Sequence, residues 1–235
     1  MSLEDEITYE FKSRGADLIT FVDVSSLTYK QNKGYPTAIL IGIALSPGYL
    51  KKVTEITDYV ENMIRNKQIN EDEFHLTELK TDRLADEMAY FLNSNGYSAY
   101  SQSEDNIYLT GFYKLKRNTT PLPHKTIALM AGLGWIGKHN LLVTPEYGSA
   151  LSMCTVLTDA SLKIVLHSPG KPQCGDCQIC TQICSPKAIK GKSWSSDIPR
   201  DERIDVSKCT TCLKCLTFCP FTQNYVKNSD ILLIN

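Results

Sequence analysis

The chain has 235 residues, 42% of them hydrophobic, and its 25 basic residues nearly balance its 26 acidic ones, for a formal net charge of -1. This length allows one or two domains with a sizeable core, and the balanced charge argues against nucleic acid as a partner. The N-terminus, MSLEDEITYEF, lacks the basic and apolar regions of a signal peptide, and no stretch approaches the roughly 20 apolar residues of a membrane span. We therefore expect a cytoplasmic protein without a membrane partner.

The chain up to about residue 160 predicts a mixture of helices and strands. Residues 3–15 place apolar side chains on one helical stripe, with Ser2 as a cap and Gly15 as a stop. Further helices are predicted from apolar residues at helical spacing, within 53–64, 84–95 and 124–131. Strands are predicted from short β-branched and apolar runs at 17–24, 35–45, 97–103, 107–113 and 149–160. The basic run 114–118 and the prolines after it predict a loop, and the whole pattern predicts an α+β fold.

Two runs of four cysteines stand near the C-terminal end, CGDCQICTQIC and CTTCLKCLTFCP, and each has the spacing CxxCxxCxxxC. Two-cluster bacterial ferredoxins share this spacing, and there the fourth cysteine of each run ligates the cluster of the other run. We therefore expect two 4Fe-4S clusters with crossed ligands. Cluster 1 would be held by Cys174, Cys177, Cys180 and Cys219, and cluster 2 by Cys209, Cys212, Cys215 and Cys184.

Other uses of these cysteines fit the sequence less well. Disulfides would need an oxidising compartment, and a chain of this length does not depend on them for its core. Structural zinc sites usually pair CxxC units across a spacer, whereas three cysteines follow one another at intervals of three here. The ninth cysteine, Cys154, lies inside a predicted strand and is expected to be a small buried hydrophobe. Because the composition changes around residues 169–172, we place a first domain at 1–168 and a ferredoxin-like domain at 169–235.

Gly132, Gly134 and Gly137 form a GxGxxG motif. A dinucleotide-binding site needs a strand before these glycines and a helix after them, and the flanking sequence predicts the opposite order. Glycines at this density indicate that the backbone lies close to something bulky. That neighbour is either a large cofactor or, in a tight turn around a core tryptophan, the protein itself.

The stretch HKTIALMAGLGWIGKHNLLVTPEYGS, followed by the two cysteine runs, resembles epoxyqueuosine reductase, a family similar to the reductive dehalogenases. The resemblance covers residues 119–220 closely and the earlier residues only in general layout. It implies that a cobalamin-binding domain of nitroreductase-like α+β build is joined to the ferredoxin-like domain. It also implies a corrinoid cavity formed in part by Gly134, Trp135, Ile136, Gly137 and Lys138.

The sequence departs from this family at the proton donor. Asn118 stands where the family has an aspartate, and an amide cannot donate a proton as a carboxylic acid does. His124 and Lys125 are the candidate catalytic substitutes. Since the chain ends soon after Cys219, we also expect a short form without the family's C-terminal helical-repeat domain, which helps to hold transfer RNA.

The sequence thus predicts a cobalamin-associated iron-sulfur oxidoreductase. It would take single electrons from a ferredoxin or flavodoxin and pass them through both clusters to a corrinoid. The outcome would be reductive chemistry on a small-molecule substrate or reductive activation of a corrinoid. The alternatives are an electron-transfer protein without cobalamin whose first domain docks a partner, an epoxyqueuosine reductase acting on tRNA, and a flavin- or nicotinamide-linked reductase.

Overall fold

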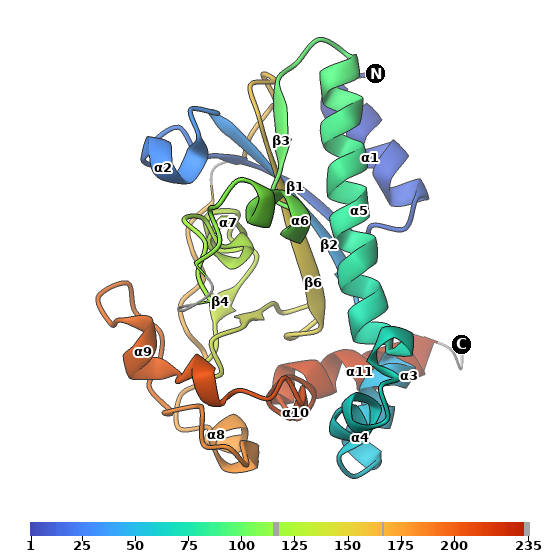
Figure 1. The fold of residues 1–235 in the computed structure, drawn as a ribbon, viewed down its shortest axis with the longest axis vertical. Coiled ribbons are helices and arrows are strands. Elements are labelled where there is room, and N and C mark those ends of the chain that lie inside the picture. The colour runs from blue at the N-terminus through green and yellow to red at the C-terminus, as the bar shows by residue number, and fades with distance from the viewer. Residues whose placement is uncertain (115–117, 166, 233–235) are drawn as a thin grey trace. The chain divides into compact units, whose positions relative to one another are not determined.

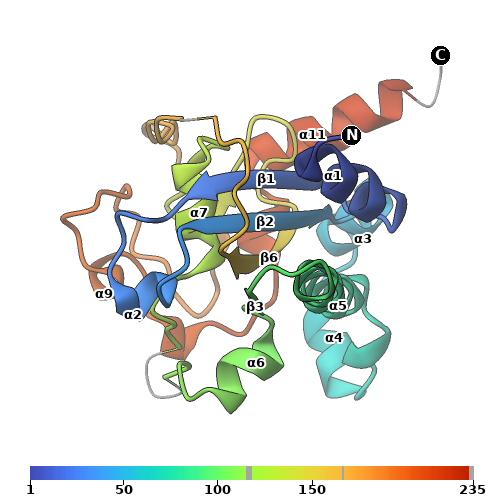
Figure 2. The same cartoon turned by 90° about the horizontal axis from the view of Figure 1, so that it is seen from above.

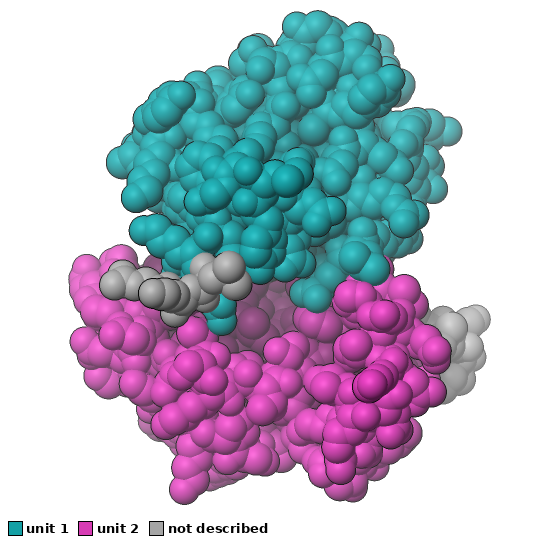
Figure 3. All heavy atoms as spheres, in the orientation of Figure 1, with its two compact units in different colours: residues 1–43, 77–132, 152–168 teal, residues 44–76, 133–151, 169–235 magenta. Residues whose placement is uncertain are grey.

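The computed structural model describes residues 1–114, 118–165 and 167–232, so part of the basic run predicted at 114–118 lies outside the described residues. The chain combines helices and sheet and forms two compact units (Figures 1 and 3). The first unit is Met1–Ile43, Thr77–Gly132 and Ser152–Ser168; the second is Ala44–Leu76, Leu133–Leu151 and Pro169–Asn235. The expected domains, 1–168 and 169–235, stay a prediction, and the last crossing between the units falls between Ser168 and Pro169. The earlier crossings differ from the two contiguous domains that we expected, because the strands of one sheet come from separate stretches of the chain.

The first unit is built on a four-stranded sheet with the order β1-β2-β6-β3. Its strands are β1 (Leu18–Asp23), β2 (Thr37–Ala44), β3 (Ala99–Ser101) and β6 (Leu151–Thr158). β1 and β2 are antiparallel, with Leu18 opposite Gly42. β3 and β6 are also antiparallel, with Ala99 opposite Thr158. Four of the five predicted strands are therefore present.

Two helices, α1 (Leu3–Ser13) and α5 (Glu73–Ser94), lie side by side against one face of this sheet (Figures 1 and 2). Ser2 forms a reciprocal capping box with Asp5 at the start of α1, as expected for a serine in that position. Apolar residues of the two helices and of the facing strands form one continuous core, which includes Ile7, Phe11, Ile39, Ile41, Leu84, Met88, Leu92, Cys154 and Val156. Burial of these side chains is what fixes the two helices on the sheet.

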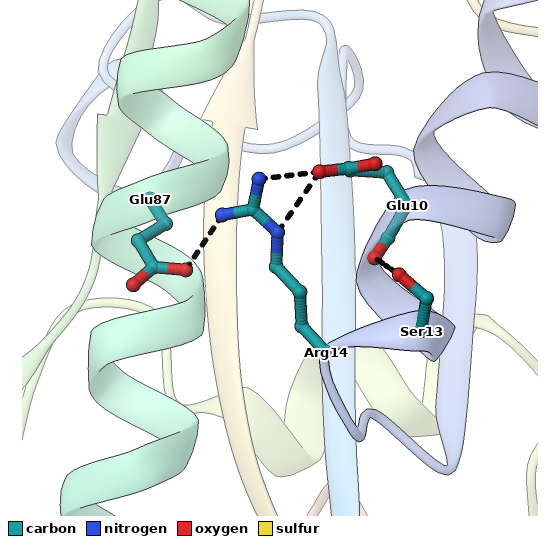
Figure 4. A network of polar contacts seen from close by, with 4 residues as sticks. All are labelled: Glu10, Ser13, Arg14 and Glu87. Carbon is teal, nitrogen blue, oxygen red and sulfur yellow. Dashed lines mark hydrogen bonds and ion pairs between the residues drawn. The ribbon is translucent and has the colours of Figure 1, made fainter.

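An ion-pair network also joins α1 to α5 (Figure 4). The guanidinium of Arg14, the residue that follows α1, donates to Glu10 of α1 and, over 2.9 Å, to Glu87 of α5. All three side chains are about 40% exposed, and exposed ion pairs contribute at most about 1 kcal/mol. The network orients the surface of the two helices, and the core beneath it supplies most of the stability.

The remaining helices of the first unit are α2 (Tyr29–Asn32), α6 (Glu104–Leu109) and α7 (His124–Met130). α7 was predicted, but the strand predicted at 107–113 is wrong, because residues 104–109 form α6. Glu104 and Asp105 lie in the first turn of this helix, where carboxylates are favourable, and only Ile107 is buried. The β-branched and aromatic residues of this stretch therefore do not form a strand.

The second unit is mostly helical. The stretch predicted as one helix at 53–64 contains parts of two, α3 (Pro47–Glu55) and α4 (Tyr59–Arg65), and the turn η1 (Ile69–Glu71) follows. A short hairpin pairs β4 (Trp135–Ile136) with β5 (Leu142–Val143). The elements near the cysteines are α8 (Ile179–Ile183), α9 (Arg200–Arg203), η3 (Val206–Lys208), α10 (Lys214–Thr217) and α11 (Pro220–Leu232). Within the described ranges, none of the helices has the length and apolar character needed to cross a membrane.

Candidate functional site

Four cysteines from two distant parts of the chain line one cavity of the second unit: Cys174, Cys177, Cys180 and Cys219. Burial raises the pKa of the Cys180 thiol, and the nearby thiols of Cys174, Cys177 and Cys219 raise it further. All four side chains therefore belong to one region of the second unit. The structure therefore brings together the four residues predicted for cluster 1, including the one from the other run.

The second predicted set gathers in the same way. Burial raises the pKa of Cys215, and so do the neighbouring thiols, among them Cys209, Cys212 and Cys184. Cys184 and Cys215 pack, partly buried, against an apolar cluster formed by Cys180, Ala188, Ile189 and Ile204. The ligand assignment itself stays a prediction, but each fourth cysteine lies beside the three of the other run.

Thiols, which make up both groups, are the donors that an iron-sulfur cubane requires. Within the described part of the chain, no three His, Cys, Asp or Glu side chains meet closely enough to hold one metal ion. A cubane needs a different arrangement, since each thiolate binds a separate iron at a separate corner of the cluster. Two groups of four thiols, each spread around one region, fit that requirement.

The two distant cysteines also receive backbone hydrogen bonds, which stabilise a thiolate. Cys219 precedes α11, and the N–H groups of Phe221 and Thr222 at the start of that helix lower the pKa of Cys219 against the larger effect of burial. The Ala188 N–H lies 3.3 Å from Cys184 Sγ. The fourth cysteine of each run is therefore held by N–H donors of the residues that follow it.

The glycine-rich stretch forms the β4–β5 hairpin of this same unit. A Cβ on Gly134 would lie only 1.9 Å from the Val143 carbonyl oxygen, so the two strands approach through a bare backbone. At the other end of the stretch, a Cβ on Gly148 would lie 2.3 Å from the Thr222 backbone nitrogen. A helix precedes the motif and a hairpin follows it, which agrees with the argument against a dinucleotide fingerprint. These glycines pack the hairpin on itself and on the start of α11.

Lys138 and His139, which follow this motif, line the cavity of the four cysteines. The Lys138 ammonium donates to the carbonyl oxygens of Gly175, at 2.7 Å, and of Cys177, at 3.0 Å. His139 Nδ1 accepts from the Leu141 N–H, so a neutral ring carries its proton on Nε2, 3.2 Å from Ser149 Oγ. The stretch therefore supports the first cysteine loop. The sequence did not predict this supporting role.

The other residues predicted for a corrinoid cavity are inside the protein. Trp135 and Ile136 are each 1% exposed, and the Trp135 ring packs edge-on against Phe221 at 4.8 Å between centroids. The space beside Gly134 and Gly137 is filled by other residues of the hairpin. The Lys138 side chain reaches the first cysteine loop. In this arrangement the five residues serve packing and the cysteine cavity. Their corrinoid role stays a prediction.

The candidate proton donors lie in the first unit. His124 begins α7, and its Nδ1 lies 2.9 Å from Thr155 Oγ1. Desolvation lowers the pKa of His124 to about 4, so the ring is neutral at pH 7 and carries no imidazolium proton to donate. Lys125 is the next residue of α7. Asn118 Oδ1 accepts a hydrogen bond of 3.0 Å from the Tyr113 hydroxyl, so this amide is held as an acceptor.

A second cavity, of about 420 Å³, lies in the first unit and was not predicted. Four aromatic side chains and two lysines line it: Tyr29, Lys30, Lys33, Tyr35, Tyr100 and Phe112. The Lys33 ammonium sits 3.1 Å from the centre of the Phe112 ring and 4.3 Å from that of Tyr100. Its residues are scattered along the chain without a motif, so the sequence offered no signal for it.

Comparison with curated proteins finds epoxyqueuosine reductases among the relatives of this chain. An epoxyqueuosine reductase from Synechococcus sp. (strain RCC307) is 32% identical over 124 residues, which cover 48% of this chain and 38% of the relative. Another from Lactococcus garvieae (strain Lg2) is 28% identical over 173 residues, or 74% of this chain and 41% of the relative. The resemblance to epoxyqueuosine reductases is confirmed. No family profile matches the chain, and it spans only about two fifths of the length of these two curated relatives.

Solved structures show that this chain shares its fold with an epoxyqueuosine reductase and with a reductive dehalogenase. A reductive dehalogenase, described with a mechanism for B12-dependent dehalogenation, aligns with a TM-score of 0.64 and 17% identity over 96% of this chain and 33% of its own. An epoxyqueuosine reductase bound to a modified tRNA stem loop aligns with a TM-score of 0.57 and 18% identity over 95% and 66%. The tRNA stem loop is bound by that relative.

Proposed function

We propose that this chain is an iron-sulfur oxidoreductase that carries single electrons through two 4Fe-4S clusters to a corrinoid. A reduced ferredoxin or flavodoxin would lose one electron for each electron that the corrinoid gains. The reduced corrinoid would serve reductive chemistry on a small molecule or be the product itself. The observation that carries the proposal is the convergence of Cys174, Cys177 and Cys180 with Cys219, which is more than 30 residues away in sequence, around one cavity.

When bound, the clusters supply the one-electron chemistry, and the protein sets burial, orientation and charge around them. Cys219 and Cys184 receive N–H hydrogen bonds, which favour the thiolate form needed for iron ligation. Pro220 and Phe221 add apolar surface to the first cavity, and the Trp135 ring of the hairpin packs against Phe221. Lys138 anchors the loop that carries Cys174 and Cys177.

Electron delivery to a corrinoid is the version that this chain's residues favour. His124 is neutral at pH 7, and Asn118 replaces an acid, so neither supplies the proton that a substrate reduction would need. Passing an electron to a corrinoid requires no general acid. An epoxyqueuosine reductase activity on tRNA, suggested by the curated relatives, is the second candidate.

Anaerobic reconstitution tests the proposal. The wild-type chain should take up about eight irons and eight sulfides, since each cubane holds four of each. Cobalamin is then titrated into the same sample, and the electron paramagnetic resonance spectrum of its cob(II)alamin form is compared with that of free cobalamin. Eight irons with an altered cobalt signal support the proposal. Eight irons with an unaltered cobalt signal leave an electron-transfer protein without cobalamin, and few or no irons overturn both.

A further inference from the structure

Lys138 is a buried cation beside the cavity of cluster 1. Its side chain lines the cavity with the four cysteines, and the residue is only 5% exposed. Two of the three ammonium protons are directed to carbonyl oxygens inside the first cysteine run, those of Gly175 and Cys177. The lysine charge is therefore held in a fixed position next to this cavity.

No carboxylate of the described chain forms an ion pair with Lys138. The acidic residue of the same cysteine loop, Asp176, is exposed, and water and salt screen an exposed charge. A buried charge is screened much less. The surroundings of the first cavity thus carry a positive charge that the nearby protein does not neutralise.

The second cysteine run has a lysine too, but its charge is neutralised. Lys214, between Cys212 and Cys215, forms ion pairs with Asp58 and, at 3.2 Å, with Glu61. Lys208, just before this run, is exposed and lies 3.6 Å from Asp205. The surroundings of the two cysteine groups therefore differ in charge, although the spacing of the two runs is identical.

We propose that Lys138 makes cluster 1 the more easily reduced of the two clusters, so that an electron entering the protein comes to rest there. The inference rests on the proposed function. Reduction adds one negative charge to a cluster, and a fixed positive charge nearby stabilises that added charge in a poorly screened interior. Cluster 2, whose neighbouring lysine is already paired with two carboxylates, lacks this stabilisation. Electrons then run from cluster 2 to cluster 1.

The test is a redox titration of the reconstituted chain, followed by electron paramagnetic resonance, in which the two clusters give two waves. K138Q keeps amide donors for the two carbonyls but removes the charge, and K138R keeps the charge. K138Q should move only the higher-potential wave downward, by at least a tenfold change in the redox equilibrium, or about 59 mV for one electron. K138R should stay near wild type. The surface variant K192Q, which loses an exposed pair with Glu202, should shift neither wave.

A second measurement does not depend on any lysine variant. C219A removes a predicted ligand of cluster 1, and this variant should lose the higher-potential wave and keep the lower one. Loss of the lower wave instead overturns the proposal, as does a K138Q titration in which both waves move equally or neither moves. Iron content separates the two levels of failure. If wild type binds few irons, the proposed function fails, whereas about eight irons with unshifted waves defeat only the role of Lys138.

Discussion

The two compact units use cysteine in opposite ways. In the first unit, Cys154 is fully buried in a continuous apolar core, where desolvation and Asp82 raise the pKa of its thiol well above the usual range. In the second unit, eight cysteines gather in two groups beside smaller apolar clusters. A thiol kept protonated inside a core is an inert hydrophobe, while grouped thiols with N–H donors are prepared for metal. Surroundings, and not residue type, separate the two uses.

The largest expected effect is the loss of iron when two cysteines of the second unit are replaced together. If ligation is crossed, C174S/C219S removes two ligands of one cluster and leaves about four irons, whereas C174S/C184S damages both clusters and leaves almost none. Iron and sulfide analysis of both variants decides the matter. The reverse order of iron contents would mean that each run holds its own cluster. C154A, from the core of the first unit, should still bind about eight irons and serves as the control.

Removing the iron should sharpen the contrast between the units. Metal binding contributes folding free energy where ligands are part of a small core, as Cys180 is in the second unit. We expect chelation to raise the hydrogen exchange of α8 and α10 at least tenfold, while β2 and α5 of the first unit keep their protection. Exchange measured by mass spectrometry on the holo and chelated chain checks this. Equal loss of protection in both units would show that they unfold together.

Some of the features behind these two predictions could be predicted from the sequence, and others could not. The crossed cysteine groups follow from spacing alone, and the α1 cap and the strands at 18–23, 37–44 and 151–158 follow from local pattern. The interleaving of the units could not be predicted, because it arises from contacts between residues far apart in the chain. α6 was missed since its aromatic and β-branched residues favour strands on composition, whereas the acidic first turn and one buried side chain fit a helix.

The residues of the candidate site could in part be predicted from the sequence, but their surroundings could not. Lys138 could be singled out from the glycine motif, but its neighbours could not, because its partners Gly175 and Cys177 lie almost 40 residues further on. His124 was visible as a titratable residue near the motif. Its neutral state depends on burial, which only the folded structure provides. Chemistry that depends on spacing within one run is readable from sequence, and chemistry that depends on long-range packing is not.

A smaller effect is expected from the hairpin that supports the first cysteine loop. In Gly134→Ala the new Cβ would clash with the Val143 carbonyl, and because backbone must move, we expect a loss of about 3 kcal/mol in unfolding free energy. In Gly48→Ala, at the start of α3, the new Cβ would meet only Ser46 Oγ at 4.0 Å, an ordinary contact, and stability should change by less than about 0.5 kcal/mol. Urea unfolding of the two variants, followed through Trp135 fluorescence, measures the difference. A tolerated Gly134→Ala would contradict the close packing of this hairpin.

The smallest expected effect concerns His124 in the first unit. Its pKa in the folded chain is about 4, below the ordinary value of 6.5, so the fold favours the neutral ring. Above pH 6.5 the ring is neutral in both the folded and the unfolded chain, so it does not reduce the free energy of unfolding. As the pH falls from 6.5 toward 4, only the unfolded chain takes up the proton, and the free energy of unfolding decreases. NMR should therefore show the ring signals of His124, assigned by their absence in H124Q, unchanged between pH 7.5 and 5.5. Since desolvation causes the shift, T155V should leave them equally constant, and a midpoint near 6.5 would restore His124 as a candidate acid.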